Sequence, residues 1–200
     1  LFRSSTRNNH FTTLSDITVQ IENAFYNFEN SNHEDQATLL GAISIPDQKT
    51  DVNDTRRLSA PRSYGSSSYF AGLTYNRTYV DWLGFISPGF LVTTTRNHLR
   101  LGSQYLYQAG IGRNLIGITD RFVAIGLIEF NGQYTKKDTL FGHNLRNTGG
   151  NVITAVPSLW FSTKHLIVQL GISFPVIQSL NGNQTPMHYG FAGDLIWTLG

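Results

Sequence analysis

Apolar and polar residues alternate along most of this chain, in at least seven stretches of nine to twelve residues. The clearest runs from His165 to Val176, where every second residue from Leu166 onward is apolar and Gln169, Gly171 and Ser173 lie between them. Successive side chains of a β-strand point to opposite sides, so this pattern predicts a strand with one apolar and one polar face.

The same alternation predicts nine strands, at 16–28, 38–45, 69–76, 82–95, 99–113, 122–134, 152–161, 165–176 and 189–199. Most are about twice as long as the strands of a soluble sandwich, and they match what a tilted strand needs to cross a bilayer. We therefore predict an all-β fold, an antiparallel up-and-down transmembrane β-barrel that forms a single outer-membrane domain over 1–200.

The connections between these strands differ in length. Long ones (46–67, 135–150 and 177–188) are expected at one end, and short ones (near Asp81, 115–120 and 162–164) mostly at the other, with the Arg96–Asn97 turn as a short exception. This asymmetry and an even strand number are typical of bacterial outer-membrane barrels. About ten strands are expected, with a tenth in Leu1–Asn9, or twelve if an N-terminal hairpin is missing.

Composition is compatible with this prediction. The chain is 40% hydrophobic but has no run of 18 apolar residues, so no transmembrane helix is expected. Charged residues make up 14%, against about 25% in ordinary soluble domains. The net charge of +2 is dispersed, which argues against a nucleic-acid surface, and the absence of cysteine excludes disulfides and thiolate chemistry. The chain begins at Leu1 without a signal-peptide pattern, so a mature or truncated start is expected.

Tyr and Trp residues gather near the expected strand ends, where amphipathic rings suit the headgroup zone of a membrane. They are Tyr69, Tyr75, Tyr79, Trp82, Tyr105, Tyr107, Tyr134, Tyr189 and Trp197. The alternative is that these rings fill the core of a soluble barrel.

Pro88, Pro157 and Pro175 each remove a ladder donor and are expected at bulges or strand ends.

Several short segments resemble one family of outer-membrane proteins. They are Ile128-Glu129-Phe130-Asn131-Gly132, Thr148-Gly149-Gly150, Val156-Pro157-Ser158-Leu159, Gly171-Ile172-Ser173-Phe174-Pro175-Val176 and Leu180-Asn181-Gly182-Asn183-Gln184. The chain, mainly from Trp82 on, resembles the outer-membrane proteins of the phenol-degradation MetA-pathway family. The resemblance implies an outer-membrane barrel with a role in uptake of hydrophobic or aromatic compounds, and it supplies no catalytic residues.

The last strand is also similar to the assembly signal of outer-membrane barrels, which ends on an aromatic residue in phase with alternating apolar positions. Leu195, Trp197 and Leu199 keep that phase, but the chain stops at Gly200, one position before the expected aromatic. This departure predicts a trimmed terminus.

Catalytic and metal-binding patterns are weak. Outer-membrane hydrolases place a His and a Ser two residues apart on one strand face, and no His-x-Ser occurs here, so we predict no enzyme activity and no cofactor. The run His33-Glu34-Asp35 is interpreted as a solvated turn rather than a metal site, because adjacent strand residues point apart.

Polar residues in phase with the expected interior are the candidate lumen-lining set. They are Gln20, Glu22, Arg100, Gln104, Gln108, Glu129, Asn131, Gln169 and Asp194. Unpaired charges are costly on a lipid-facing surface, so their common phase favours an interior position. They either line a narrow polar pore or form a hydrogen-bonded plug, since a barrel of eight to ten strands is nearly filled by side chains. Inward apolar residues such as Leu83, Phe85, Leu91 and Leu106 suit a plug or an apolar ligand path.

Three functions are compatible with the sequence. The first is a passive channel or uptake route in the bacterial outer membrane for small hydrophobic or aromatic compounds, with membrane lipids around it. The second is a structural barrel that anchors a protein partner through its loops or periplasmic turns. The third is a soluble lipid-binding barrel of the lipocalin kind.

Overall fold

The computed structural model describes residues 17–46, 66–118 and 122–197, and every regular element in these ranges is a β-strand. The long strands are β1 (Ile17–Glu29), β2 (His33–Ile45), β3 (Ser68–Tyr79), β4 (Trp82–Thr93), β6 (Gln104–Ile118), β7 (Phe122–Thr135), β10 (Gly150–Thr163), β11 (Leu166–Leu180) and β12 (Gly190–Trp197). The short strands are β5 (Leu99–Arg100), β8 (Thr139–Leu140) and β9 (His143–Asn144). The described ranges hold no helix that could cross a membrane. The predicted all-β fold is confirmed.

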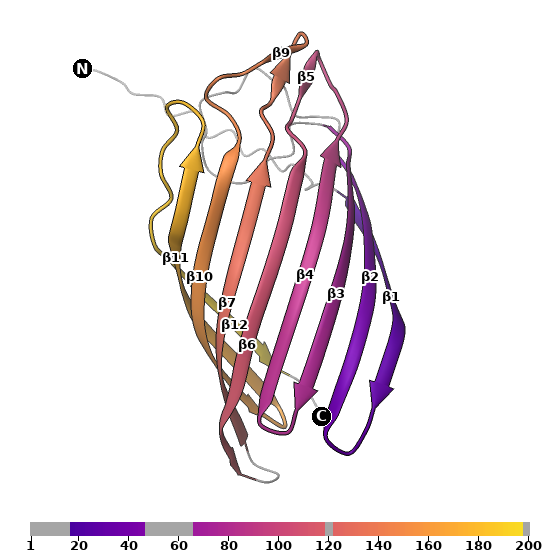
Figure 1. The fold of residues 1–200 in the computed structure, drawn as a ribbon, viewed down its shortest axis with the longest axis vertical. Helices are drawn as coiled ribbons and strands as arrows, with labels where there is room; N and C mark the ends of the chain where they lie inside the picture. Colours follow the sequence, from indigo (N-terminus) through magenta and orange to yellow (C-terminus); the bar gives the residue numbers. More distant parts are fainter. Residues whose placement is uncertain (1–16, 47–65, 119–121, 198–200) are drawn as a thin grey trace, which may run out of the picture.

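The nine long strands form one antiparallel sheet in the order β1-β2-β3-β4-β6-β7-β10-β11-β12. This order follows the sequence, so the sheet is the meander that the alternation predicts. Figure 1 shows the sheet curling until β12 passes behind β6 and β7. In the described part of the chain β1 and β12 remain edge strands, so the sheet is open. The predicted tenth strand, Leu1–Asn9, lies outside the described residues.

Because the meander is antiparallel, its connections alternate between two ends (Figure 1). Among the described residues, the connections 30–32, 80–81 and 164–165 lie at one end, and 94–103, 136–149 and 181–189 lie at the other. The predicted separation of short from long connections is confirmed. The prediction of a short connection at Arg96–Asn97 is wrong, because these residues belong to a longer connection, 94–103.

The first hairpin differs from the prediction, which ended one strand at 28, began the next at 38 and placed His33-Glu34-Asp35 in a turn. Strand β2 begins at His33, so only 30–32 separate it from β1. Asn30 closes the turn, with its Oδ1 accepting hydrogen bonds from the backbone N–H groups of Asn32 (2.8 Å) and His33 (2.9 Å). The polar residues at the start of β2 join the ladder because they pair across it with β3, a non-local contact that the local pattern does not contain.

The predicted strand 99–113 is wrong at its start and at its end. Asn97 and His98 have positive φ, and Arg96 and Leu99 exchange two backbone hydrogen bonds around them, so the chain makes a tight hairpin there. Leu99 then pairs with β8, in a small sheet of order β5-β8-β9, and β6 begins only at Gln104. Strand β6 continues to Ile118 through a bulge between Asn114 and Ile116, in place of the predicted connection 115–120.

All three prolines lie inside strands, and two of them are neither at a bulge nor at a strand end, unlike the prediction. Pro88 pairs with Tyr107 of β6 but has no partner on β3, and Pro157 pairs with Ile128 of β7 but has no partner on β11. Proline has no backbone N–H to donate, so each of these residues is unpaired on the side where its strand would need that donor. Pro175 does lie at a bulge, opposite Thr154, as predicted.

The sheet has almost no hydrophobic core. Among the described residues, the buried apolar ones are Ala37, Ala124, Leu127 and Ala155, and no large side chain is completely buried. A single curved layer therefore leaves its apolar side chains exposed.

Candidate functional site

Cross-strand partners in a ladder share a face of the sheet, so the register assigns each candidate residue to a side. Gln108 is opposite Asn131, Asn131 is opposite Thr154, and Gln169 is opposite Asp194. Extending these rows over all nine strands places eight candidates on one side, the polar face: Gln20, Glu22, Gln104, Gln108, Glu129, Asn131, Gln169 and Asp194. Arg100, the ninth, lies outside this sheet, on β5.

Charged residues are sorted by sign between the two faces. Within the described strands of the nine-stranded sheet, the polar face carries Glu22, Glu29, Glu34, Glu129 and Asp194 and no Lys, Arg or His. The basic residues of these strands, His33, Arg77 and Arg113, lie on the opposite face. The polar face of the described strands is therefore acidic.

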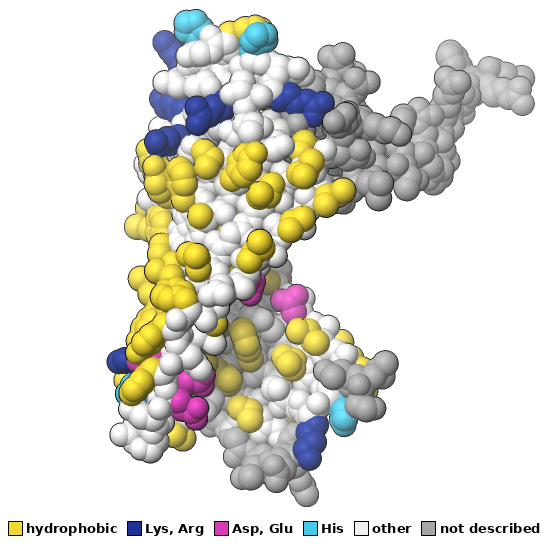
Figure 2. Space-filling model, turned by 90° about the vertical axis from the view of Figure 1, so that its right-hand side faces the viewer, with side chains coloured by type: hydrophobic (Ala, Val, Ile, Leu, Met, Phe, Trp, Pro, Cys, Tyr) yellow, Lys and Arg dark blue, Asp and Glu magenta, His cyan; other side chains and the backbone are white. Residues whose placement is uncertain are grey.

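Two adjoining cavities hollow the polar face. The upper one, of about 650 Å³, has a mixed lining of apolar side chains such as Phe70 and of amide and hydroxyl side chains, including Asn131, Gln133, Thr154 and Gln184. The lower one, of about 370 Å³, extends toward the short connections. Ser87 and Gln108 line both, so the two cavities adjoin each other along the strands. Figure 2 shows the molecule hollowed at mid-height.

The lower cavity has apolar walls around one carboxylate. Glu129 is half-buried, and Leu83, Phe85, Ile125, Leu127 and Trp160 line the same space. Glu129 pairs with Gly110 of β6. A side chain at Gly110 would collide with the Phe85 ring, so the ring occupies the space that this glycine leaves free. The aromatic ring is thereby held one strand away from the carboxylate.

Trp160 is a cavity residue that sequence reasoning missed. The alternation over 152–161 gives no clear phase, so neither Trp160 nor Thr154 could be assigned to a face. Their cross-strand partners place both on the polar face, because Trp160 pairs with Gln169 and Thr154 pairs with Asn131. Trp160 Nε1 and Ser158 Oγ are buried without a hydrogen-bond partner, which leaves two polar atoms unsatisfied near the lower cavity.

The other side of the sheet is an apolar face that is open to its surroundings. Ile21, Leu170 and Leu195 are 71%, 56% and 70% exposed, and Ile43, Ile86, Ile111, Ile128, Phe130, Leu159, Ile172 and Phe191 are also exposed. In Figure 2 hydrophobic side chains run down the left margin, which is the side facing the viewer in Figure 1. Lys and Arg gather near the upper end, at the long connections.

Aromatic side chains mark both ends of the apolar face. Tyr69 and Tyr79 lie on β3, with Tyr105 near Tyr69 in height and Trp82 near Tyr79. Ten residues of strand span ~33 Å, or ~25 Å in height at the usual tilt, which is the height of the apolar band of a membrane barrel. Lys136 lies over the Tyr105 ring (5.7 Å), and Arg113 lies over the Trp82 ring (5.0 Å).

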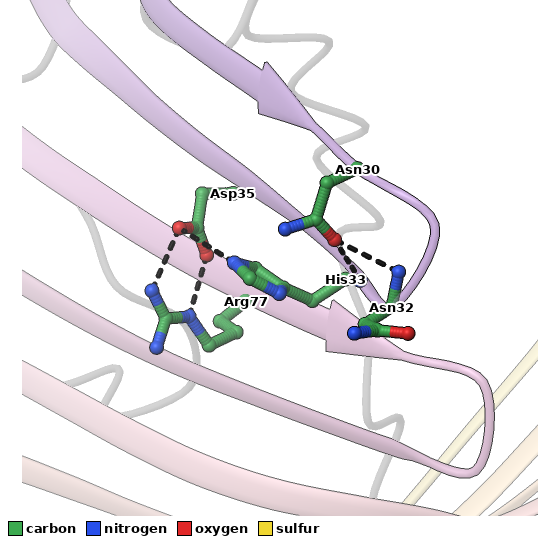
Figure 3. Close-up of polar contacts among 5 residues, drawn as sticks. All are labelled: Asn30, Asn32, His33, Asp35 and Arg77. Atoms are coloured by element: carbon green, nitrogen blue, oxygen red, sulfur yellow. Dashed lines mark hydrogen bonds and ion pairs between the residues drawn. The ribbon is translucent and has the colours of Figure 1, made fainter.

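One ion pair lies on the apolar face at the short-connection end (Figure 3). Arg77 donates from Nε to Asp35 Oδ1 (2.6 Å) and from Nη2 to Asp35 Oδ2 (2.7 Å). His33 Nε2 is 3.6 Å from Asp35 Oδ2, and its ring lies between those of Phe28 and Tyr79. The buried carboxylate on this face is thus fully paired with a neighbouring cation.

No metal site emerges from the described residues, which contain no suitable group of three or more His, Asp or Glu side chains. His33, Glu34 and Asp35 form part of β2 rather than the expected turn, and Glu34 points to the other face. No family model matches the chain, and no curated protein matches it.

Proposed function

We propose that the chain is an outer-membrane β-barrel that acts as a passive channel or uptake route for small hydrophobic or aromatic compounds. The observation that carries the proposal is the apolar face. Large aliphatic and aromatic side chains are exposed across it, and its charged residues lie near the short-connection end. Such a surface suits acyl chains, because apolar side chains exposed to water lose the main stabilising term of folding.

A sheet that spans a membrane has to close on itself. Unpaired edge N–H and C=O groups in lipid cost several kcal/mol each, so a membrane sheet needs both edges paired. In an antiparallel sheet of nine strands, β1 and β12 run in the same direction. One further strand, antiparallel to both, would close the sheet with the even number typical of these barrels.

The placement of the cavities supports the channel role. These two cavities lie on the polar face and extend along the strands, and a further hollow of about 720 Å³ lies on the apolar face. A water-soluble barrel of the lipocalin kind would turn polar side chains outward, whereas the face away from these two cavities exposes large apolar side chains. The resemblance to the MetA-pathway family agrees with this proposal and names aromatic compounds as the class of solute.

Planar-bilayer recording tests the proposal. The refolded protein should give discrete current steps, and its migration on a gel should depend on heating. A protein that is soluble without detergent would contradict the membrane assignment.

A structural barrel that anchors a protein is the second candidate. The small sheet β5-β8-β9 favours it, because it extends the structure beyond the long-connection end and presents an ordered surface there (Figure 1). A sealed barrel without current that co-purifies with another protein would support this alternative.

A further inference from the structure

We propose that the lower cavity of the polar face binds a small organic cation, a positively charged amine or quaternary ammonium group on an apolar body. This inference deepens the proposed function and rests on it, since it names the class of solute for the same passage. The cavity supplies three features that such a molecule needs: a negative charge, aromatic rings and an apolar wall.

The negative charge is Glu129. It is half-buried, and no ion pair or hydrogen bond to its side chain occurs among the described residues. Its nearest strand neighbours on the same face are Gly110 and Val156, neither of which offers a polar side chain. A carboxylate in partly desolvated surroundings attracts a cation more strongly than the same group in water. Glu129 therefore has a charge to which the described protein provides no counterion.

The aromatic rings are those of Phe85 and Trp160, which line the cavity from two different strands. Aromatic faces attract ammonium groups through the ring quadrupole, and quaternary ammonium ligands are commonly bound in this way. The glycine at position 110 gives the Phe85 ring room beside the carboxylate. The ring and the charge are therefore held in neighbouring positions by the backbone.

Leu83, Ile125 and Leu127 complete the wall below Glu129 and suit the apolar body of the ligand. Above Glu129, Ser87, Gln108 and Asn131 offer polar groups that solvate a charge passing along the polar face. An anion is disfavoured, because the polar face presents five carboxylates and no basic side chain within the described strands. The arrangement thus selects by charge as well as by shape.

Isothermal titration calorimetry on the folded full chain in neutral detergent tests the inference, with three probes of similar shape. Benzyltrimethylammonium is expected to bind at least ~10-fold more tightly than benzyl alcohol, and benzenesulfonate is expected to show no binding. Glu129→Gln should weaken binding of the cation by at least ~10-fold. Glu22→Gln, which removes a carboxylate of the same face far from this cavity, should leave binding unchanged.

Equal binding of the three probes, no binding by the parent protein, or equal loss in both variants would overturn the inference. The comparison of probes uses the parent protein, so it holds even if Glu129→Gln fails to fold. Bilayer recording gives an independent readout. Current without cation binding would contradict the cation site but support the channel. Cation binding without current would contradict the channel but support the binding site.

Discussion

The Arg77 guanidinium donates two parallel hydrogen bonds, of 2.6 and 2.7 Å, to the Asp35 carboxylate on the otherwise apolar face of the sheet. The Asp35 side chain is 6% exposed, whereas the Arg77 side chain is 43% exposed. The pair joins β2 to β3 next to the short connections, beside the rings of Phe28, His33 and Tyr79. The buried Asp35 carboxylate is tolerated on this face because the positive charge of Arg77 neutralises it.

Asp35→Asn is expected to destabilise the folded protein, because it leaves Arg77 without its anion on the apolar face. Glu34→Gln is the matched control, since Glu34 is the exposed neighbour on the polar face. Urea unfolding in detergent, followed by heat-modifiable gel migration, should give a lower midpoint for Asp35→Asn than for Glu34→Gln. Equal midpoints would show that the pair makes no net contribution to stability.

Gly110→Ala is expected to destabilise the protein by about 1–3 kcal/mol, because the new methyl group collides with the Phe85 ring. Gly41→Ala is the control, since a methyl group there meets no atom within 4 Å. Both free energies of unfolding come from denaturant titration. Adding Phe85→Leu to Gly110→Ala should restore part of the loss. No restoration would mean that the ring is not the obstacle.

Asp138→Ala is expected to loosen the small sheet without affecting the large one. Asp138 Oδ1 accepts a hydrogen bond from Gly102 N (2.7 Å), and its own N–H donates to Thr148 Oγ1 (2.9 Å). Losing a bond to a charged acceptor costs about 1.5–3 kcal/mol, so local opening should become ~10- to 100-fold more frequent. Limited proteolysis at 94–103 and 136–149 measures this effect, with Lys137→Ala as the control. An unchanged cleavage rate would contradict the assigned role of Asp138.

The long strands and their two faces could be predicted from sequence because a period of two needs no knowledge of the partner strand. Ile17–Glu29 overlaps the predicted strand 16–28 with a shift of one residue at each end, and Leu166–Leu180 overlaps the predicted strand 165–176 but ends four residues later. The alternation also assigned Gln108, Asn131 and Glu129 to the face where the cavities lie.

Features that depend on distant contacts could not be predicted. His33 and Asp35 look like turn residues until Tyr79 and Arg77 are placed opposite them. Arg100 keeps the alternating phase of 99–113, yet the positive φ of Asn97 and His98 and the pairing of Arg100 with Thr139 place it in another sheet. Trp160 lacked a clear local phase and was located only through Gln169. In each case a partner far away in the sequence decides the outcome.

Ile128→Lys tests which side of the sheet meets the membrane. Ile128 is 49% exposed near the middle of the apolar face, and a Lys at the midplane of a lipid-facing surface costs about 2–4 kcal/mol. Gln133→Lys, an exposed position on the polar face of the same strand, is the control and should cost under about 1 kcal/mol, since water reaches that side. Reversible guanidinium unfolding in phospholipid vesicles gives both values. If Gln133→Lys proves the more harmful, the two faces are assigned the wrong way round and acyl chains do not contact Ile128.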